Sequence, residues 1–437
     1  MVGMRGFEPP ASASRTLRSS QTEPHPAGKA QYTLPTIKAT PFKLSKQGTW
    51  RKLSADIKNY GAFGHSFILQ LACIFEQGFA MISVLVVDDS AFMRKLLTTA
   101  LAKDPDIRVL DAAKDGDDAL EKIASLNPDV VTLDVEMPHR DGLSTLEEIM
   151  KISPRPVIMI SSLTREGAEI TLKCLDVGAL DFIPKNSAQP EAVITDLLPR
   201  IKAVARKRAL LSLRRTLHSA ETRPARSPAH SSPPASQPKP SSPPAGPRDI
   251  VAIGVSTGGP PAVQKVLTAL PKDFPASILI AQHMPAAFTG PFAKRLDTQC
   301  AISVKEAEQG DKIQPGYAYI APGGRHMLLE RHGATPELTI SAEPANELYK
   351  PSASILMNSV AQINPRRTVG VILTGMGSDG CAGIKTLKES GGYILAQSEA
   401  SCVVYGMPKA VVDAGLADQI IDIGDMATAI VAAVQGK

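Results

Sequence analysis

A serine between two glycines follows an apolar stretch of the chain. Gly254, Ser256 and Gly258 have the G-x-S-x-G spacing of a turn that exposes a serine hydroxyl between a strand and a helix. Pro261 suits the first turn of that helix. The amides of Thr257 to Gly259 would then lie at the positive helix end, where an oxyanion is stabilised. A serine here is equally an ordinary helix cap, so a base and an acid are needed to decide.

Three histidines follow Ser256 in the chain. His283 ends an apolar run, His326 follows a glycine turn, and His332 lies in a polar segment where solvent exposure is expected. This pattern leaves His283 and His326 as rival candidates for the base. A capping or packing role for either histidine fits the pattern equally well. An α/β hydrolase has the order Ser, acid, His, and no histidine follows His332. The order Ser, His, acid fits better, because triads are recognised by geometry.

An acidic residue lies inside a late glycine-rich loop. Gly375, Gly377 and Gly380 have the spacing of a dinucleotide site, and Glu399 follows about 20 residues later. Asp379 inside that loop would repel a pyrophosphate. A carboxylate at a strand end is better suited to hold an imidazole, with glycines allowing close backbone packing. A nicotinamide or flavin enzyme remains the alternative.

A second set of polar residues follows earlier apolar runs: Asp88, Asp89, Asp134, Ser161 and Lys185. The carboxyl ends of parallel strands share one edge of a sheet, where functional residues gather. Three converging carboxylates repel one another and require a hard cation, for which Mg²⁺ fits. With Mg²⁺ bound, Asp134 can attack a phosphoryl donor, while Lys185 and the Ser161 hydroxyl hold the incoming oxygens. Each aspartate taken singly is more commonly a helix cap.

The elements that must position these residues form two series. Short apolar runs alternate with helical patterns over 81–203 and again over 249–437. Such alternation predicts an α/β protein with two doubly wound parallel sheets, for which the resemblances described below imply one flavodoxin-like and one Rossmann-like domain. Between them, 204–248 begins as a basic helix and continues as a Pro/Ser-rich linker.

Composition narrows the function classes. The 437-residue chain has a formal charge of +5, but residues 1–80 hold ten Lys and Arg against four Asp and Glu. The remainder is therefore not basic, which disfavours nucleic-acid binding. Five dispersed cysteines indicate reduced thiols in a cytoplasmic protein. The apolar run 66–75 is too short for membrane insertion. We expect 1–80 to be disordered or mis-assigned, with native translation starting at Met81.

The motifs VLVVDDS, LDVEMPHRDG, MISS and DFIPK resemble the receiver domain of bacterial response regulators across 81–203. The resemblance implies phosphorylation at Asp134 and a switch aromatic at Phe182. It implies Mg²⁺ held chiefly by three carboxylates: Asp88, Asp89 and Asp134. Asn186 departs from the family, in which proline often follows the lysine. Because many receivers control DNA-binding effectors, a transcription factor is the competing interpretation, although no helix-turn-helix motif follows.

The second series carries IGVSTGGP, AQHMP, YIAPGGRHM, KPSASILMNSVA, ILTGMGSDG and CVVYGMPKA. Together these resemble the catalytic domain of the chemotaxis protein-glutamate methylesterase across 249–437. The resemblance implies Ser256 as nucleophile, His283 as general base and Asp379 as its orienting acid. Lys350 and Ser354 stand where the family more often has Arg and Asp. We expect these departures to affect substrate contacts or domain packing, and not the triad.

The resemblance also implies an activity and its partners. The reaction is hydrolysis of glutamate γ-methyl esters on chemoreceptors, with deamidation of receptor glutamines, giving sensory adaptation. Backbone N–H groups of Thr257 and Met376 are the candidate oxyanion donors. A chemotaxis histidine kinase is the implied phosphodonor. Mg²⁺ serves receiver phosphorylation only, and no cofactor is expected for the esterase chemistry.

Overall fold

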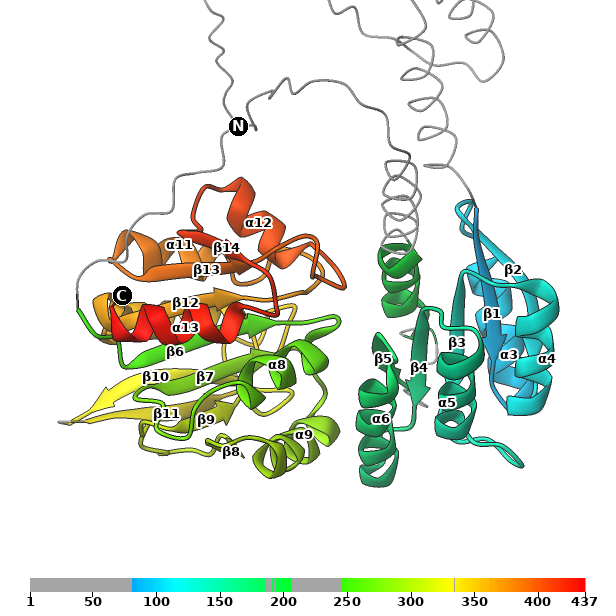
Figure 1. Ribbon diagram of the computed structural model, residues 1–437, viewed down its shortest axis with the longest axis horizontal. Coiled ribbons are helices and arrows are strands. Elements are labelled where there is room, and N and C mark those ends of the chain that lie inside the picture. Colours follow the sequence, from blue (N-terminus) through cyan, green and yellow to red (C-terminus); the bar gives the residue numbers. More distant parts are fainter. Residues whose placement is uncertain (1–80, 186–190, 192, 206–245, 334, 437) are drawn as a thin grey trace, which may run out of the picture. The chain divides into compact units, whose positions relative to one another are not determined.

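The computed structural model describes residues 81–185, 191, 193–205, 246–333 and 335–436. The expectations about 1–80, Asn186 and most of 204–248 lie outside these residues. The described chain is α/β, with two parallel sheets and one antiparallel hairpin (Figure 1). Within the described ranges, every helix is too short or too polar to cross a lipid bilayer.

The first sheet has the strand order β2-β1-β3-β4-β5, and all of its pairings are parallel. This is the flavodoxin-like doubly wound order. Its strands are β1 (Ile82–Val87), β2 (Ile107–Ala113), β3 (Val130–Asp134), β4 (Val157–Ser161) and β5 (Asp181–Pro184). Its helices are α3 (Ala91–Leu101), α4 (Gly116–Leu126), α5 (Gly142–Ile152) and α6 (Arg165–Val177), followed by a helix that includes 193–205.

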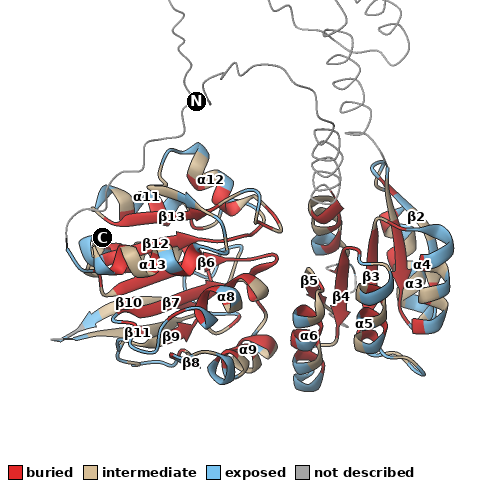
Figure 2. Cartoon of the chain, viewed as in Figure 1, coloured by how far each residue is buried: buried red, intermediate tan, exposed pale blue. Residues whose placement is uncertain are grey.

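Side-chain alternation along β1 explains the helices on both faces of this sheet. Leu85 and Val87 belong to the core that contains buried residues of α4 and α5. Val84 and Val86 belong to the core formed with α3 and helix 193–205. Successive strand residues point to opposite faces, so a strand that is apolar throughout is buried on both. Figure 2 shows the strands buried and the outer helix faces exposed.

The second sheet has the order β14-β13-β12-β6-β7-β9-β8, again with parallel pairings. Its strands are β6 (Ile250–Val255), β7 (Ser277–Gln282), β8 (Ser303–Glu306), β9 (Tyr317–Ile320), β12 (Thr368–Ile372), β13 (Tyr393–Gln397) and β14 (Gln419–Ile421). Its helices are α8 (Gly259–Thr268), α9 (Ala286–Gln299), α10 (Ala353–Ile363), η2 (Pro365–Arg367), α11 (Cys381–Glu389), α12 (Met407–Asp413) and α13 (Met426–Gln435).

The helices of this second series also divide between the two faces of their sheet. Val251, Ile253 and Val255 of β6 share a core with α8, α9 and α13. Ile250 and Ala252 share the opposite core with α10, α11 and α12. The predicted α/β class with two doubly wound sheets is therefore confirmed.

An antiparallel hairpin was not predicted from the sequence, nor were the strands β2, β8 and β14. β10 (His326–His332) and β11 (Thr335–Ser341) form an antiparallel hairpin, and buried residues of both join the core that contains α10. The turn carries Gly333 at φ 82°, a conformation that favours glycine.

The strand order places a topological switch at β6. From β6 the chain continues to β7 on one side, and it returns later to β12 on the other. Ligands of open α/β sheets bind beyond the carboxyl ends of strands at such a point. The ends of β6, β7 and β12 are therefore the part of the fold to search for chemistry.

Candidate functional sites

Ser256 follows the last residue of β6 and is 8% exposed. The next turn needs Gly258, which has φ 70° and caps the start of α8. A Cβ at Gly258 would lie 2.4 Å from the Cβ of Val403, so any larger residue would displace the turn. Sharp backbone curvature thus carries the chain from strand to helix directly after the serine.

The amides beside Ser256 are not equivalent. Gly259 N–H donates to the Ser256 carbonyl oxygen at 2.8 Å, so it is not free, contrary to expectation. Among the described residues, neither Thr257 N–H nor Met376 N–H makes a hydrogen bond. Of the predicted oxyanion donors, these two amides are therefore without a competing hydrogen bond in the described residues.

Strand register brings His283 beside Ser256. Val255 pairs with Gln282, and His283 N–H donates to the Val255 carbonyl oxygen at 3.0 Å. Ser256 N–H in turn donates to the Thr374 carbonyl oxygen at 3.0 Å, beyond the end of β12. The residues that follow the three strands therefore converge on one rim of the sheet.

His283 and Asp379 are in direct contact. His283 Nε2 lies 2.8 Å from Asp379 Oδ2, and their side chains are 8% and 9% exposed. The other ring nitrogen, Nδ1, is buried and has no hydrogen-bond partner within the described structure. No hydrogen bond joins Ser256 Oγ to His283 in the described part of the chain. The nucleophile and base candidates are thus neighbours through their backbones, with the imidazole Nδ1 unengaged.

Asp379 is held by the start of α10. Its Oδ2 accepts from Ala353 N–H at 2.7 Å, and its Oδ1 accepts from Ser354 N–H at 3.0 Å and Ser352 Oγ at 3.1 Å. Burial alone would raise the pKa of Asp379, but the hydrogen bond and charge of His283 and the α10 donors hold it well below its usual range. Asp379 is therefore a fixed carboxylate aimed at one imidazole nitrogen.

His326 has a different environment from its rival. It is fully buried; its Nδ1 accepts from Ser352 N–H at 3.2 Å, and its Nε2 lies 3.3 Å from the Pro344 carbonyl oxygen. Burial lowers the pKa of His326, which suits a neutral ring that accepts at one nitrogen and donates at the other. Both nitrogens are engaged with backbone, so His326 is a structural residue.

The acidic residues of the first sheet also meet at one edge. Carboxylate oxygens of Asp88, Asp89 and Asp134 lie within 4.8 Å of one another, the one such set of three possible metal ligands in the described residues. Lys185 Nζ lies 2.6 Å from Asp134 Oδ2 and 3.0 Å from Asp88 Oδ2. The three carboxylates thus form a compact acidic cluster, and the Lys185 ammonium group contacts two of them.

Comparison with known proteins gives the family. Two family models match: CheB methylesterase over residues 251–430 and response regulator receiver domain over residues 84–196. Protein-glutamate methylesterase/protein-glutamine glutaminase 2 of Nitratidesulfovibrio vulgaris is 61% identical over 362 residues, covering 80% of this chain and 98% of the relative. The chain belongs to the CheB methylesterase family.

Two further similar proteins are a curated relative and a solved structure. Protein-glutamate methylesterase/protein-glutamine glutaminase 1 of Oleidesulfovibrio alaskensis is 56% identical over 367 residues, covering 81% of this chain and 100% of the relative. The crystal structure of the Thermotoga maritima CheB methylesterase catalytic domain is 38% identical with a TM-score of 0.41, and it covers 42% of this chain and 97% of that chain.

Gln282 is a site residue that the sequence reasoning missed in this CheB-family chain. Its Nε2 donates to the carbonyl oxygens of both Ser256 and His283, each at 3.1 Å, and the residue is 1% exposed. One side chain thus ties the backbone of the nucleophile candidate to that of the base candidate. The available signal was an amide at the end of an otherwise apolar buried strand.

The two departures from the CheB family pattern differ in position. Ser354 Oγ accepts from Gly380 N–H at 2.8 Å, and Ser354 N–H donates to Asp379. It contacts the acid and its loop directly, and the expectation that this departure leaves the triad unaffected stays a prediction. Lys350 Nζ donates to the Ala342 carbonyl oxygen at 3.2 Å on the surface.

Two predicted receiver residues lie at their expected strands without joining the acidic cluster. Ser161 ends β4, but its hydroxyl accepts from Thr171 Oγ1 at 2.6 Å and lies 3.3 Å from the Gly167 carbonyl oxygen, both on α6. Contact with a phosphoryl oxygen would require this hydroxyl to leave α6. Phe182 lies in β5, opposite Met159 of β4.

The acidic cluster of the CheB receiver fits a hard cation. Burial raises the pKa of Asp134 to about 6, with Lys185 opposing the shift and Asp88 reinforcing it. Asp134 resists ionisation because it is buried beside two other carboxylates. Mg²⁺ prefers oxygen ligands, and its charge would relieve the repulsion among the three carboxylates. Asp88, Asp89 and Asp134 would hold the ion, which would supply charge neutralisation for an incoming phosphoryl group.

Titration of Asp134 predicts how stability depends on pH. An unfolded aspartate titrates near pH ~3.9, whereas Asp134 in the fold titrates near 6. The folded state therefore binds this proton more tightly, and stability that is present below pH ~4 is lost as pH rises through about 6. The loss is at most about 3 kcal/mol.

Thermal unfolding of the full chain from pH 4 to 8 measures this effect. Mg²⁺ should raise the melting temperature most above pH 6, and Asp134→Asn should remove much of the pH-dependent loss. Equal stabilisation by Mg²⁺ at pH 4.5 and pH 7.5 would contradict the assignment.

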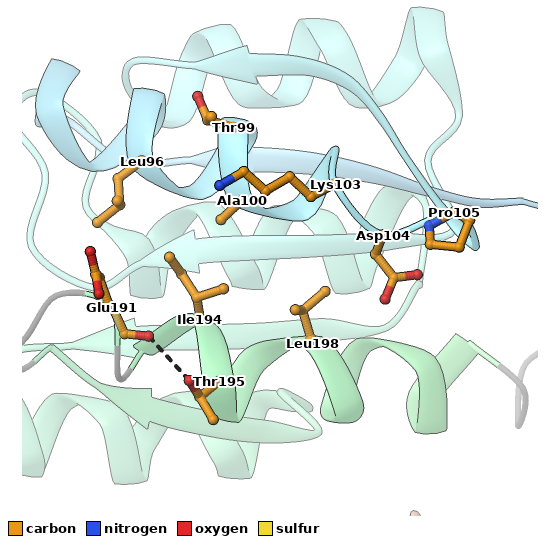
Figure 3. Close-up of a pocket in the computed structure, with 10 residues that line it drawn as sticks. All are labelled: Leu96, Thr99, Ala100, Lys103, Asp104, Pro105, Glu191, Ile194, Thr195 and Leu198. Atoms are coloured by element: carbon orange, nitrogen blue, oxygen red, sulfur yellow. Dashed lines mark hydrogen bonds between the residues drawn. The ribbon is translucent and has the colours of Figure 1, made fainter.

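A separate groove lies on the receiver part of the chain. It runs between α3 and the helix that includes 193–205, has a volume of about 540 Å³, and is lined by apolar and polar side chains (Figure 3). Within it, Thr195 Oγ1 donates to the Glu191 carbonyl oxygen at 3.4 Å. None of its lining residues belongs to the acidic cluster or to the rim that carries Ser256. It has no evident part in either chemistry.

Proposed function

We propose that this chain is a phosphorylation-activated serine esterase that hydrolyses glutamate γ-methyl esters on chemoreceptors and deamidates receptor glutamines. The observation that carries the proposal is the 2.8 Å contact of His283 Nε2 with Asp379 Oδ2, at the rim where Ser256 follows β6. Membership of the CheB methylesterase family supports the substrate class. The same chemistry would serve sensory adaptation in chemotaxis, in the cytoplasm.

In the acylation step, Ser256 Oγ attacks the γ-carbonyl carbon of the ester while His283 takes the hydroxyl proton. Asp379 accepts from Nε2, so the proton acceptor is Nδ1, the nitrogen with no partner in the described structure. The imidazolium then protonates the departing methoxide oxygen, so that methanol leaves and the acyl-serine remains. Catalytic hydrogen bonds often tighten only with substrate bound, so the proposal requires Ser256 Oγ to turn towards Nδ1.

Negative charge develops on the carbonyl oxygen during this attack. The amides of Thr257 and Met376 support its stabilisation, because neither is engaged within the described residues. Preorganised donors of this kind are typically worth ~10²–10³-fold in turnover each. Water then attacks the acyl-serine, with His283 accepting its proton, and free glutamate leaves. Deamidation follows the same steps with ammonia as the leaving group, and neither route calls on a cofactor.

Control of this esterase is assigned to the receiver, for which we propose the boundaries 81–203, with the esterase domain at 249–437. A histidine kinase would transfer its phosphoryl group to Asp134, with Mg²⁺ on the acidic cluster and Lys185 holding the phosphoryl oxygens. The Ser161 hydroxyl would break its hydrogen bonds to α6 and contact the phosphoryl oxygens. Phe182 would respond as the switch aromatic. The unphosphorylated receiver is proposed to cover Ser256, and the linker 204–248 permits docking and release.

Methanol release from methylated receptor by the full chain tests both halves of the proposal. A small acyl phosphate with Mg²⁺ should raise the rate several-fold in the wild-type chain. Asp134→Asn should retain the basal rate and lose the increase, because the phosphoacceptor is absent. Release of no methanol under either condition would reject the esterase assignment, whereas an equal rate with and without the phosphodonor would reject only the regulation.

A further inference from the structure

The ring of Tyr349 lies flat on the imidazole of His283. Their centroids are 4.3 Å apart and their planes differ by 8°. Resting on the proposed esterase function, we propose that Tyr349 is a positioning residue for His283. Its ring holds the imidazole plane in line between Asp379 and Ser256, and it favours the imidazolium that forms as the ester is cleaved.

The backbone around Tyr349 is built to hold this stack. His326 accepts from Ser352 N–H and contacts the Pro344 carbonyl oxygen, so one buried ring ties both ends of the segment between β11 and α10. Ser352 Oγ also donates to Asp379 Oδ1 at 3.1 Å. The segment that presents Tyr349 is thus attached to the acid that orients His283.

Tyr349 also reaches the loop that carries the oxyanion candidate. A Cβ added to Gly377 would lie 3.4 Å from the Tyr349 phenol oxygen, and Gly377 has φ 80°. Met376 directly precedes this glycine in the chain. Tyr349 therefore covers one face of the imidazole with its ring, and its phenol oxygen lies beside the loop that carries Met376.

The physical effect of the stack depends on the charge of the ring it covers. A neutral imidazole gains a stacking contact, whereas an imidazolium over the same face gains attraction to the π-electrons as well. The stack is therefore stronger in the transition state than in the resting enzyme, which affects kcat more than KM. Loss of a cation–π contact of this kind is expected to lower the rate by about 5- to 30-fold.

The test compares Tyr349→Phe with Tyr349→Leu in the full chain, using methanol release from methylated receptor. The Phe variant keeps the ring and should stay within about twofold of wild type, while the Leu variant should lose about 5- to 30-fold in kcat with little change in KM. Leu348→Ala is the matched control, because Leu348 is the neighbouring residue, is 83% exposed and should leave kcat unchanged.

A second readout separates this inference from the proposed function. Covalent labelling of Ser256 by a small organophosphonate needs the same base and no receptor, so the Leu variant should slow it by a similar factor. Wild-type methanol release reports on the esterase assignment, and the variant ratios report on Tyr349. Equal rates for Leu and wild type, a Phe variant as slow as Leu, or a change confined to KM would each overturn the proposal. If Tyr349→Leu does not unfold cooperatively, Tyr349→Met replaces it in the comparison.

Discussion

Replacing Ser256 with alanine is expected to lower kcat for methanol release by about 10⁶-fold. The reason is that no acyl-enzyme can form without Oγ, and the remaining rate enhancement comes only from substrate binding and the Thr257 and Met376 amides. Loss of organophosphonate labelling in the same variant would assign the nucleophile directly. Mass spectrometry of the labelled wild-type chain should place the adduct on the peptide that contains Ser256.

The control for this variant lies in the other part of the chain. Ser256→Ala should accept a phosphoryl group at Asp134 as rapidly as the wild type, because the acidic cluster is formed by residues at the ends of β1 and β3, with Lys185 after β5. A variant that retains more than a few per cent of wild-type turnover would remove Ser256 from the proposed mechanism.

Replacing Asp379 with asparagine is expected to lower kcat by about 10⁴-fold. The asparagine amide nitrogen can donate but not accept, and facing His283 it would favour the tautomer with the proton on Nδ1. That nitrogen could then no longer take the Ser256 proton. Steady-state methanol release, with phosphonate labelling as a second assay, measures the loss.

The same substitution should also cost stability. Asp379 accepts from Ala353 N–H and Ser354 N–H at the start of α10, and its pKa is held below its usual range in the fold. Its carboxylate therefore contributes stability above the unfolded pKa of about 3.9, and that contribution is lost as pH falls. Asp425→Asn is a suitable control, since Asp425 precedes α13 and makes no side-chain cap. An Asp379→Asn enzyme with near-normal kcat would show that the carboxylate has only a structural role.

The candidate site residues were accessible from local pattern. Ser256, His283 and Asp134 each end or follow an apolar run, and burial of parallel strands on both faces makes such runs visible in a sequence. The same pattern predicted two doubly wound sheets, and strands β6, β7, β9, β12 and β13 lie where the apolar runs indicated. Family motifs added the expected pairing of Ser256 with His283 and Asp379.

The choice between the two histidines depends on the tertiary structure. By pattern, His283 and His326 are equivalent, because both follow an apolar or turn segment near a strand end. Only packing shows that His326 is fully buried with backbone at both nitrogens, while His283 contacts Asp379, which lies 96 residues away in sequence.

Amino-acid sequence alone therefore determined the fold class, the ends of the most apolar strands and the set of candidate side chains, because hydrophobic periodicity records which strands are buried. Tertiary structure decided which of those side chains meet, how Gln282 and Ser354 support them, and that Tyr349 covers the base. It also showed that the Ser161 hydroxyl bonds to α6 and not to the acidic cluster. The physical reason is that such contacts depend on strand order and register, which join residues far apart in the chain and leave no local periodicity.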